Sequence, residues 1–177
     1  MKDSIQKVTL AVVTVLLVLT GQVLVVMASE TVRLEVTATF VGFSAADPGS
    51  CDPTTFLPNP GDQGCIATLG ELFTASGDFV GGAFVEATFA PLADGSDSFT
   101  DFQTWSGTIN GRGTGGFTLL EYDGVTRADG SYTSKLRSVD GTGTGDFQGI
   151  TACGSSKGNA TTGFNTLTLT FPGHKHH

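Results

Sequence analysis

Apolar side chains recur at every second position along most of the chain, and this alternation constrains the fold more than any other feature. In TVRLEVTATFVGF, residues 31–43, valine, leucine, alanine and phenylalanine alternate with charged residues and threonines. Such alternation, rich in β-branched residues, is typical of a strand that buries one face. After Ala28 no window repeats apolar residues at a spacing of three or four. The sequence therefore predicts an all-β fold.

Six further segments show the same alternation, at residues 67–76, 81–92, 97–109, 116–124, 131–139 and 164–171. The chain also contains dipeptides that favour hairpin turns, namely Asp94-Gly95, Asn110-Gly111, Asp123-Gly124, Asp129-Gly130 and Asp140-Gly141. Seven or eight short strands joined in this way form a sandwich or a barrel. We expect antiparallel pairing, because parallel pairs need long crossovers. The one long connection is predicted at residues 44–64.

The first 28 residues are typical of an export signal. Lys2 and Lys7 precede an apolar run at residues 8–27, and a V-x-A cleavage pattern ends at Ala28. The alternative is that residues 8–27 remain as an uncleaved membrane anchor. We therefore expect a secreted or extracytoplasmic protein that is associated with a membrane only if this segment is kept. Residues 29–172 are predicted to form a single domain.

The charge balance and the histidines exclude several classes of function. Removing Lys2, Lys7 and Asp3 leaves 7 basic and 16 acidic residues, and hence a net charge of −9. Such a surface repels phosphate backbones, so no nucleic acid partner is expected. All three histidines lie in residues 173–177, a tail that we expect to be disordered. A histidine-based catalytic triad or zinc site in the folded body is thereby excluded, and we expect no metal and no cofactor.

The cysteines predict one disulfide. Cys51 and Cys65 flank a segment too rich in proline and glycine for a regular element. In an exported chain such a pair is expected to be oxidised, which closes the loop and stabilises the fold by about 3 kcal/mol. Cys153 is left unpaired, and we expect it to be a buried free thiol.

The run GRGTGG, residues 111–116, matches the G-x-G-x-x-G pattern of dinucleotide-binding proteins. That pattern works only where a helix follows the glycines, because the helix N-terminus holds the pyrophosphate. Here a short alternating segment follows, so we expect no nucleotide binding. The related runs GTGGF, residues 113–117, and GTGDF, residues 143–147, are both predicted to start strands of a closed sheet.

The segment DGSDSFTDFQTWSGTINGRGTGGFTLLEYDG, followed by GTGTGDFQGI, resembles an uncharacterised family of small bacterial proteins with the allene oxide cyclase-like barrel. The match covers residues 94–150 and depends mainly on glycine and phenylalanine positions. The resemblance implies an antiparallel barrel of about eight strands, of the broad calycin kind, and no established activity. Gln103 stands where the family has glutamate, and Glu121 stands where it often has histidine, so a role carried over from relatives is in doubt.

The barrel interior is the candidate site. Alternate positions place seven residues on the inward faces of two neighbouring strands: Phe99, Asp101, Gln103, Trp105, Phe117, Leu119 and Glu121. Aromatic side chains with a few polar groups are the usual lining of a small-molecule pocket, and we expect Trp105 and Glu121 to face the same enclosed space. The alternative is a barrel filled by its own side chains.

Three functions follow from these alternatives. The first is binding of a small apolar ligand in the barrel, and the second is a structural or interaction role at the surface with a filled barrel. The third, implied by the resemblance, is a cofactor-independent cyclase or isomerase. In that case Glu121 is the candidate catalytic residue, because a carboxyl group in an apolar barrel has a raised pKa and can handle a proton.

Overall fold

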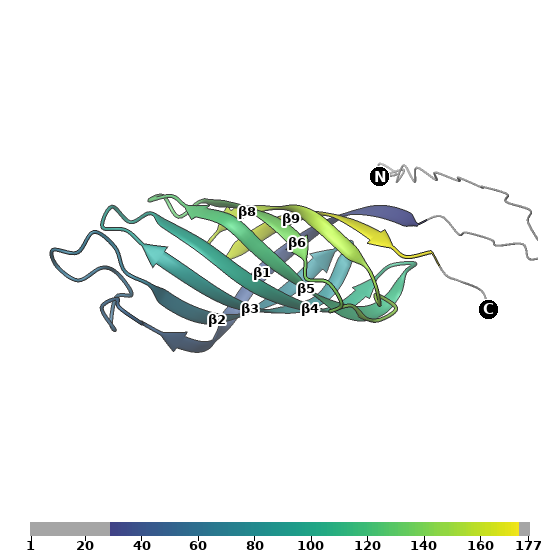
Figure 1. Cartoon of the computed structure of the whole chain (residues 1–177), viewed down its shortest axis with the longest axis horizontal. Helices are drawn as coiled ribbons and strands as arrows, with labels where there is room; N and C mark the ends of the chain where they lie inside the picture. Colours follow the sequence, from purple (N-terminus) through teal and green to yellow (C-terminus); the bar gives the residue numbers. More distant parts are fainter. Residues whose placement is uncertain (1–28, 174–177) are drawn as a thin grey trace, which may run out of the picture.

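Nine strands make up most of residues 29–173, the part of the chain that the computed structural model describes (Figure 1). They are β1 (Glu30–Asp47), β2 (Ala67–Gly77), β3 (Phe79–Pro91), β4 (Asp97–Ile109), β5 (Gly113–Thr126), β6 (Tyr132–Ser138), β7 (Thr144–Gly145), β8 (Thr151–Asn159) and β9 (Thr162–Phe171). All pairings are antiparallel, and β4 pairs with both β3 and β5. Eight strands, all except β7, therefore close into a barrel, which confirms the predicted fold class.

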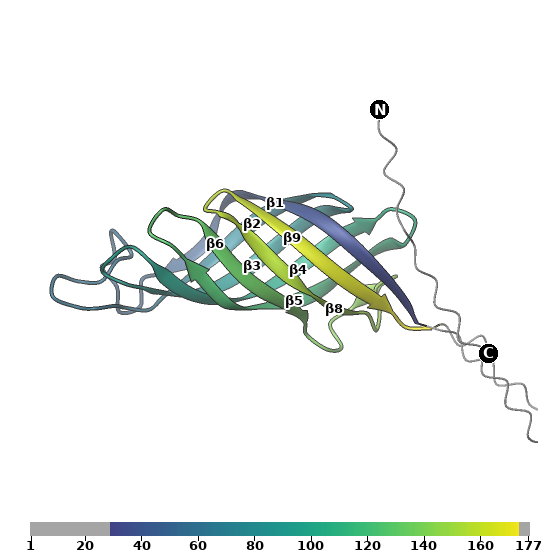
Figure 2. The same cartoon turned by 90° about the horizontal axis from the view of Figure 1, so that it is seen from above.

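The two ends of the barrel differ in the connections that they carry (Figures 1 and 2). The turns after β2 and β4, the β6–β8 connection and the outer ends of β1 and β9 lie at one end, here called the packed end. The long β1–β2 loop at residues 48–66 and the β3–β4, β5–β6 and β8–β9 connections lie at the other, the mouth end. Residues 1–28 and 174–177, which include the predicted signal or anchor and the histidine tail, lie outside the described residues. Within residues 29–173 no helix is long and apolar enough to span a bilayer.

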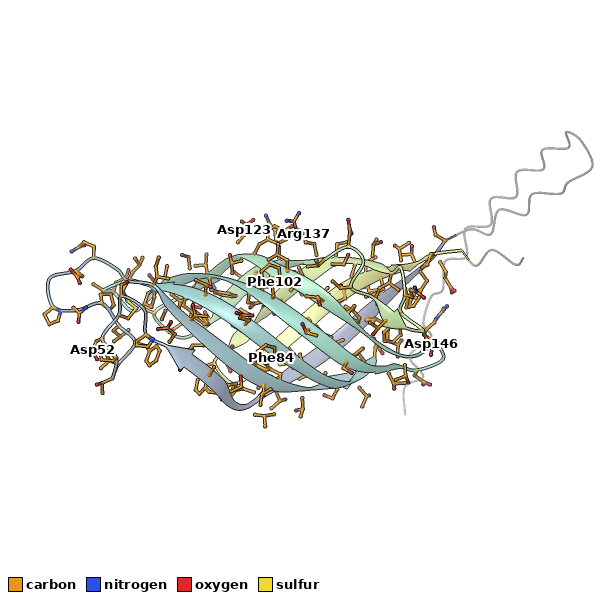
Figure 3. All side chains as sticks on the ribbon, turned by 60° about the horizontal axis from the view of Figure 1, so that its bottom comes forward. Asp52, Phe84, Phe102, Asp123, Arg137 and Asp146 are labelled. Atoms are coloured by element: carbon orange, nitrogen blue, oxygen red, sulfur yellow. A yellow bond between two sulfur atoms is a disulfide. The ribbon has the colours of Figure 1, made fainter. Side chains whose placement is uncertain are left out.

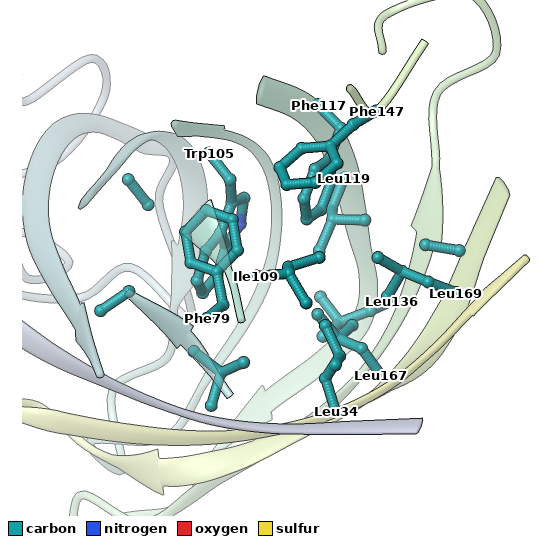
Figure 4. Packing of buried hydrophobic residues seen from close by; sticks show 14 of the residues in the cluster. Leu34, Phe79, Trp105, Ile109, Phe117, Leu119, Leu136, Phe147, Leu167 and Leu169 are labelled. Carbon is teal, nitrogen blue, oxygen red and sulfur yellow. The ribbon is translucent and has the colours of Figure 1, made fainter. Parts of the chain in front are cut away.

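Large apolar side chains fill the packed end (Figure 4). The Trp105 and Phe117 rings are nearly parallel, with centroids 6.4 Å apart. The ring of Phe79 stands edge-on to Trp105 at 5.5 Å and to Phe117 at 5.8 Å. Phe147, which is fully buried, closes this end from the β6–β8 connection. This half of the barrel has the filled core that the sequence left as one alternative.

The glycine run that matches the nucleotide pattern opens strand β5. Thr144 and Gly145, which form β7, pair with Gly116 and Gly115 at the start of that strand. A Cβ atom added at Gly115 would lie 2.9 Å from the Phe147 ring. Glycine is therefore required here by close packing of the β6–β8 connection. Residues 113–117 start the barrel strand β5, as predicted. Residues 143–147 also start a strand of the same sheet, but it is only the two-residue β7, which is not one of the eight barrel strands.

Two other strand predictions differ from the structure. Strand β8 was not predicted, because its inward positions carry only small residues: Ala152, Gly154, Ser156 and Gly158. Small residues are needed there since a Cβ atom at Gly154 would lie 3.1 Å from the side chain of Leu167. Strand β1 continues to Asp47, beyond the predicted end, through irregular pairing with β2 between Phe40 and Ala45.

The dipeptide Asp123-Gly124 was predicted to be a hairpin turn but lies within β5. Asp123 has a φ of 54°, and the pairing of β5 with β6 shifts between Tyr122 and Val125. The two residues therefore form a bulge, which explains their turn-like sequence. A Cβ atom at Gly124 would lie 2.6 Å from the Phe99 ring, so the bulge also makes room for this ring inside the barrel.

Candidate functional site

The mouth half of the barrel contains a cavity of about 570 Å³. Its walls are mainly apolar and include Phe40, Phe73, Val85, Phe89 and Phe99. The polar side chains Asp101, Gln103 and Glu121 and the indole of Trp105 line it beside the filled core. The volume is within the usual range of small-molecule sites, about 300–1,000 Å³. The barrel interior is therefore filled at one end and hollow at the other.

Five of the seven predicted site residues line this cavity, namely Phe99, Asp101, Gln103, Trp105 and Glu121. Trp105 and Glu121 thus face the same space, as predicted. Phe117 and Leu119 also point inward but belong to the filled core. They pair directly with Trp105 and Gln103. Since barrel strands are tilted, paired residues on neighbouring strands lie at different depths, which puts these two beyond the cavity.

Asp101 and Glu121 form a buried carboxyl pair. They are direct partners across β4 and β5, and their exposed fractions are 5% and 3%. Glu121 accepts hydrogen bonds from the Gln103 amide at Oε2 and from the Ser134 hydroxyl at Oε1. The indole N–H of Trp105 donates to Gln103 Oε1 at 3.0 Å, which orients the Gln103 amide group toward Glu121. A chain of hydrogen bonds thus connects the tryptophan to the carboxyl pair.

These contacts determine which carboxyl group keeps a proton. Burial raises the pKa of both groups, and the charge of Glu121 raises that of Asp101 further. Hydrogen bonds from Asp101, Ser134 and Gln103 oppose the rise at Glu121. Asp101 has an unpartnered Oδ1 instead. Asp101 therefore carries the proton and donates it toward an ionised Glu121, and the pair titrates as one unit.

A third carboxyl group lines the cavity from β2. Burial, followed by the charge of Glu121, raises the pKa of Glu71 to about 7. We call Glu71, Asp101 and Glu121 the carboxyl cluster. Tyr132 is also part of the lining, and its hydroxyl lies 3.1 Å from Ser156 Oγ. Burial raises the pKa of Tyr132 to about 12, so it stays neutral and can both donate and accept hydrogen bonds.

Sequence reasoning missed Glu71, Ser134, Tyr132 and Asn165, all of which are inward-facing residues of the mouth half. A signal for Glu71 exists, because it interrupts an alternating apolar face that includes Leu69 and Phe73. Glu121 interrupts its strand in the same way. An acidic residue on the apolar face of a strand thus indicated a cavity position in both cases.

The β1–β2 loop lies at the mouth and is held by the predicted disulfide. The sulfurs of Cys51 and Cys65 are bonded, and their Cα atoms are 5.1 Å apart. Phe56 and Leu57 of this loop reach the cavity lining. Cys153, expected to be buried, is instead an exposed free thiol, because it lies on the outward face of β8. Within residues 29–173 no group of three or more His, Cys, Asp or Glu side chains could hold a metal ion.

Fold and site together define a small antiparallel barrel with one filled end, one hollow end and buried carboxyl groups between them. No model of a known protein family matches the chain, and no curated protein matches it. A solved structure of a protein of unknown function, from the DUF3224 family of Shewanella oneidensis, is similar to it with a TM-score of 0.58. The two share 18% identity over 83% of this chain and 100% of that one. The likeness shows the fold, and both the kinship to an uncharacterised family and the allene oxide cyclase-like classification stay predictions.

Proposed function

We propose that the protein is exported and binds one small, largely apolar molecule in the cavity. The observation that carries this proposal is the hollow mouth half, whose apolar walls end on buried polar groups. A barrel with only a structural or interaction role has no need of such a space, since the same interior is filled at the packed end. The disulfide supports export, because such bonds persist in oxidising compartments.

The fluorescence of Trp105 tests this proposal directly. Trp105 is the only tryptophan in the chain, and its side chain lines the cavity. Titration with long-chain alcohols, amines, fatty acids and terpenoids should change its emission for at least one class. A barrel that binds none of them and leaves the emission constant contradicts the proposal.

A pair of variants locates the binding. Val85 lines the cavity and is the partner of Gln103 on the neighbouring strand. Val85→Phe should therefore fill part of the cavity and weaken ligand binding at least about tenfold. Thr104→Phe adds a ring of the same size on the outer face of β4 and should leave affinity unchanged. Equal losses in both variants would place the ligand elsewhere.

The proton shared by Asp101 and Glu121 favours a second candidate, a cofactor-independent isomerase or cyclase. A buried carboxyl group with a raised pKa can transfer a proton to an apolar substrate at neutral pH. The experiment is to extract the bound compound from the protein and from Glu121→Gln, both produced in the native host. A binding protein yields the same compound from both, whereas an enzyme yields product from the first and substrate from the variant.

A further inference from the structure

The polar part of the cavity lining has one sign of charge. Four carboxyl side chains line the cavity, those of Glu71, Asp97, Asp101 and Glu121, and no lysine or arginine among residues 29–173 does. The ion pair of Lys135 with Asp123, at 2.8 Å, is instead exposed to solvent. A ligand with a carboxylate or phosphate group would therefore enter a site that repels it, in surroundings of low dielectric constant.

The buried hydrogen-bonding groups without partners also favour a ligand that is not an anion. Asp101 Oδ1 and Asn165 Oδ1 belong to side chains that are 5% and 4% exposed, both line the cavity, and neither atom has a hydrogen-bond partner among residues 29–173. Both atoms are acceptors. Buried acceptors without partners are costly, so the occupant of the cavity must supply donors.

Aromatic rings line the same cavity as these acceptors. Phe99 stands edge-on to Tyr132 with ring centroids 5.8 Å apart, and Phe40 stands edge-on to Phe73 at 5.6 Å. All four rings line the cavity. Ring faces attract cations, so the walls tolerate a positive charge as well as a hydrocarbon body.

We propose that the ligand of this cavity is an apolar amine, whose protonated primary amino group donates hydrogen bonds to Asp101 Oδ1 and Asn165 Oδ1 beside the ionised Glu121. The inference rests on the proposed function and names the chemical class of its ligand. The ammonium group supplies up to three donors and one positive charge, which matches two unpartnered acceptors and one buried carboxylate. The apolar body of the ligand lies against the phenylalanine walls toward the mouth.

Four probes with the same hydrocarbon chain separate the effect of the ligand's charge from that of its N–H donors. They are decylamine, decanol, decanoic acid and decyltrimethylammonium. Binding to the full mature protein at neutral pH, below micelle concentrations, is measured by calorimetry and by Trp105 emission. Decylamine should bind about tenfold more tightly than decanol and more tightly still than decanoic acid. Decyltrimethylammonium keeps the charge but has no N–H donor, so it should bind about tenfold more weakly than decylamine.

Variants assign the effect to residues. Asn165→Leu removes one acceptor and should weaken decylamine about tenfold while strengthening or sparing decyltrimethylammonium. Glu121→Gln removes the charge with little change of shape and should reduce the preference for decylamine over decanol. Glu86→Gln makes the same charge change on the outer face of β3 and should alter neither affinity. Because Asn165 and Glu121 lie on different strands, a folding defect in one variant leaves the other as the test.

Each outcome has one meaning. Tighter binding of decanoic acid than of decylamine overturns this inference while leaving the proposed function intact, as does equal binding of the two cationic probes. Loss of the amine preference in Glu86→Gln also overturns it, since the outer charge would then be responsible. Absence of binding by all four probes counts against both the inference and the proposed function.

Discussion

Ionisation of Glu71 should lower the stability of the protein as the pH rises, and replacement of Glu71 by glutamine should abolish this pH dependence. In the folded barrel the pKa of Glu71 is raised from 4.5 to about 7 by burial and by the charge of Glu121. In the unfolded chain the pKa returns to about 4.5. Between these values the folded state holds a proton that the unfolded state has released, so the free energy of unfolding falls with rising pH.

The size of this effect follows from the shift. A rise from 4.5 to about 7 corresponds to roughly 3 kcal/mol, at about 1.4 kcal/mol for each pKa unit. Glu71 is only partly buried at the wall of an open cavity, so screening by water reduces our expectation to about 2 kcal/mol. Relative to the original protein, Glu71→Gln should therefore gain about 2 kcal/mol of stability between about pH 5 and about pH 8.

Urea denaturation of the oxidised protein across this pH range measures the difference, because urea leaves the ionic strength unchanged. Glu86→Gln is the matched control, since Glu86 is exposed on the outer face of β3. The reasoning is refuted if the stability of Glu71→Gln changes with pH in the same way as that of the original protein. It is also refuted if Glu86→Gln reproduces the gain, because burial would then not be the cause.

Three further outcomes test the packing. In thermal melting, Gly124→Ala should destabilise the protein by about 1–3 kcal/mol, because the added Cβ meets the Phe99 ring. The control is Gly42→Ala, whose added Cβ has nothing within 4 Å and which should be nearly neutral. Phe147→Ala should lower the stability by about 3–5 kcal/mol in urea, and a loss below 1 kcal/mol would mean that the packed end is not closed by this ring. Cys153 should react with a thiol reagent in the native protein, and a reaction only after unfolding would contradict its exposure.

The sequence predicted strands well where one face is apolar and poorly where it is not. The alternation at residues 97–109 matches β4 because every second residue points into the barrel. Strand β8 has inward residues as small as Gly154, which carry no hydrophobic signal although the strand is needed to close the barrel. The bulge at Asp123 resembles a turn in sequence, because Asp123 has the positive φ that hairpin turns of the Asp-Gly type also use.

The sequence predicted the site residues on β4 and β5, but not those that other strands and connections contribute. Reasoning from β4 and β5 placed Asp101, Glu121 and Trp105 on the inward face, since residues on one face of a hairpin stay together, but it did not predict that the two carboxyl groups pair. The boundary between the filled and hollow halves depends on the tilt of the strands and on Phe147, which lies in a connection between strands. The role of Glu71 depends on a neighbour that is distant in sequence, Glu121, and no local pattern reveals such proximity.

The positions at which β1 begins and β9 ends have a practical consequence for attaching this barrel to something else. Strand β1 begins and β9 ends side by side at the packed end, where Glu30 pairs with Phe171 (Figures 1 and 2). Figure 3 shows Asp146 at this end and Asp52, in the β1–β2 loop, at the opposite one, with Phe84 and Phe102 on the outer wall between them. A reporter, affinity support or carrier joined at the start of β1 or the end of β9 therefore leaves from the side opposite the mouth. Immobilised barrels should thus keep their cavities accessible to solution.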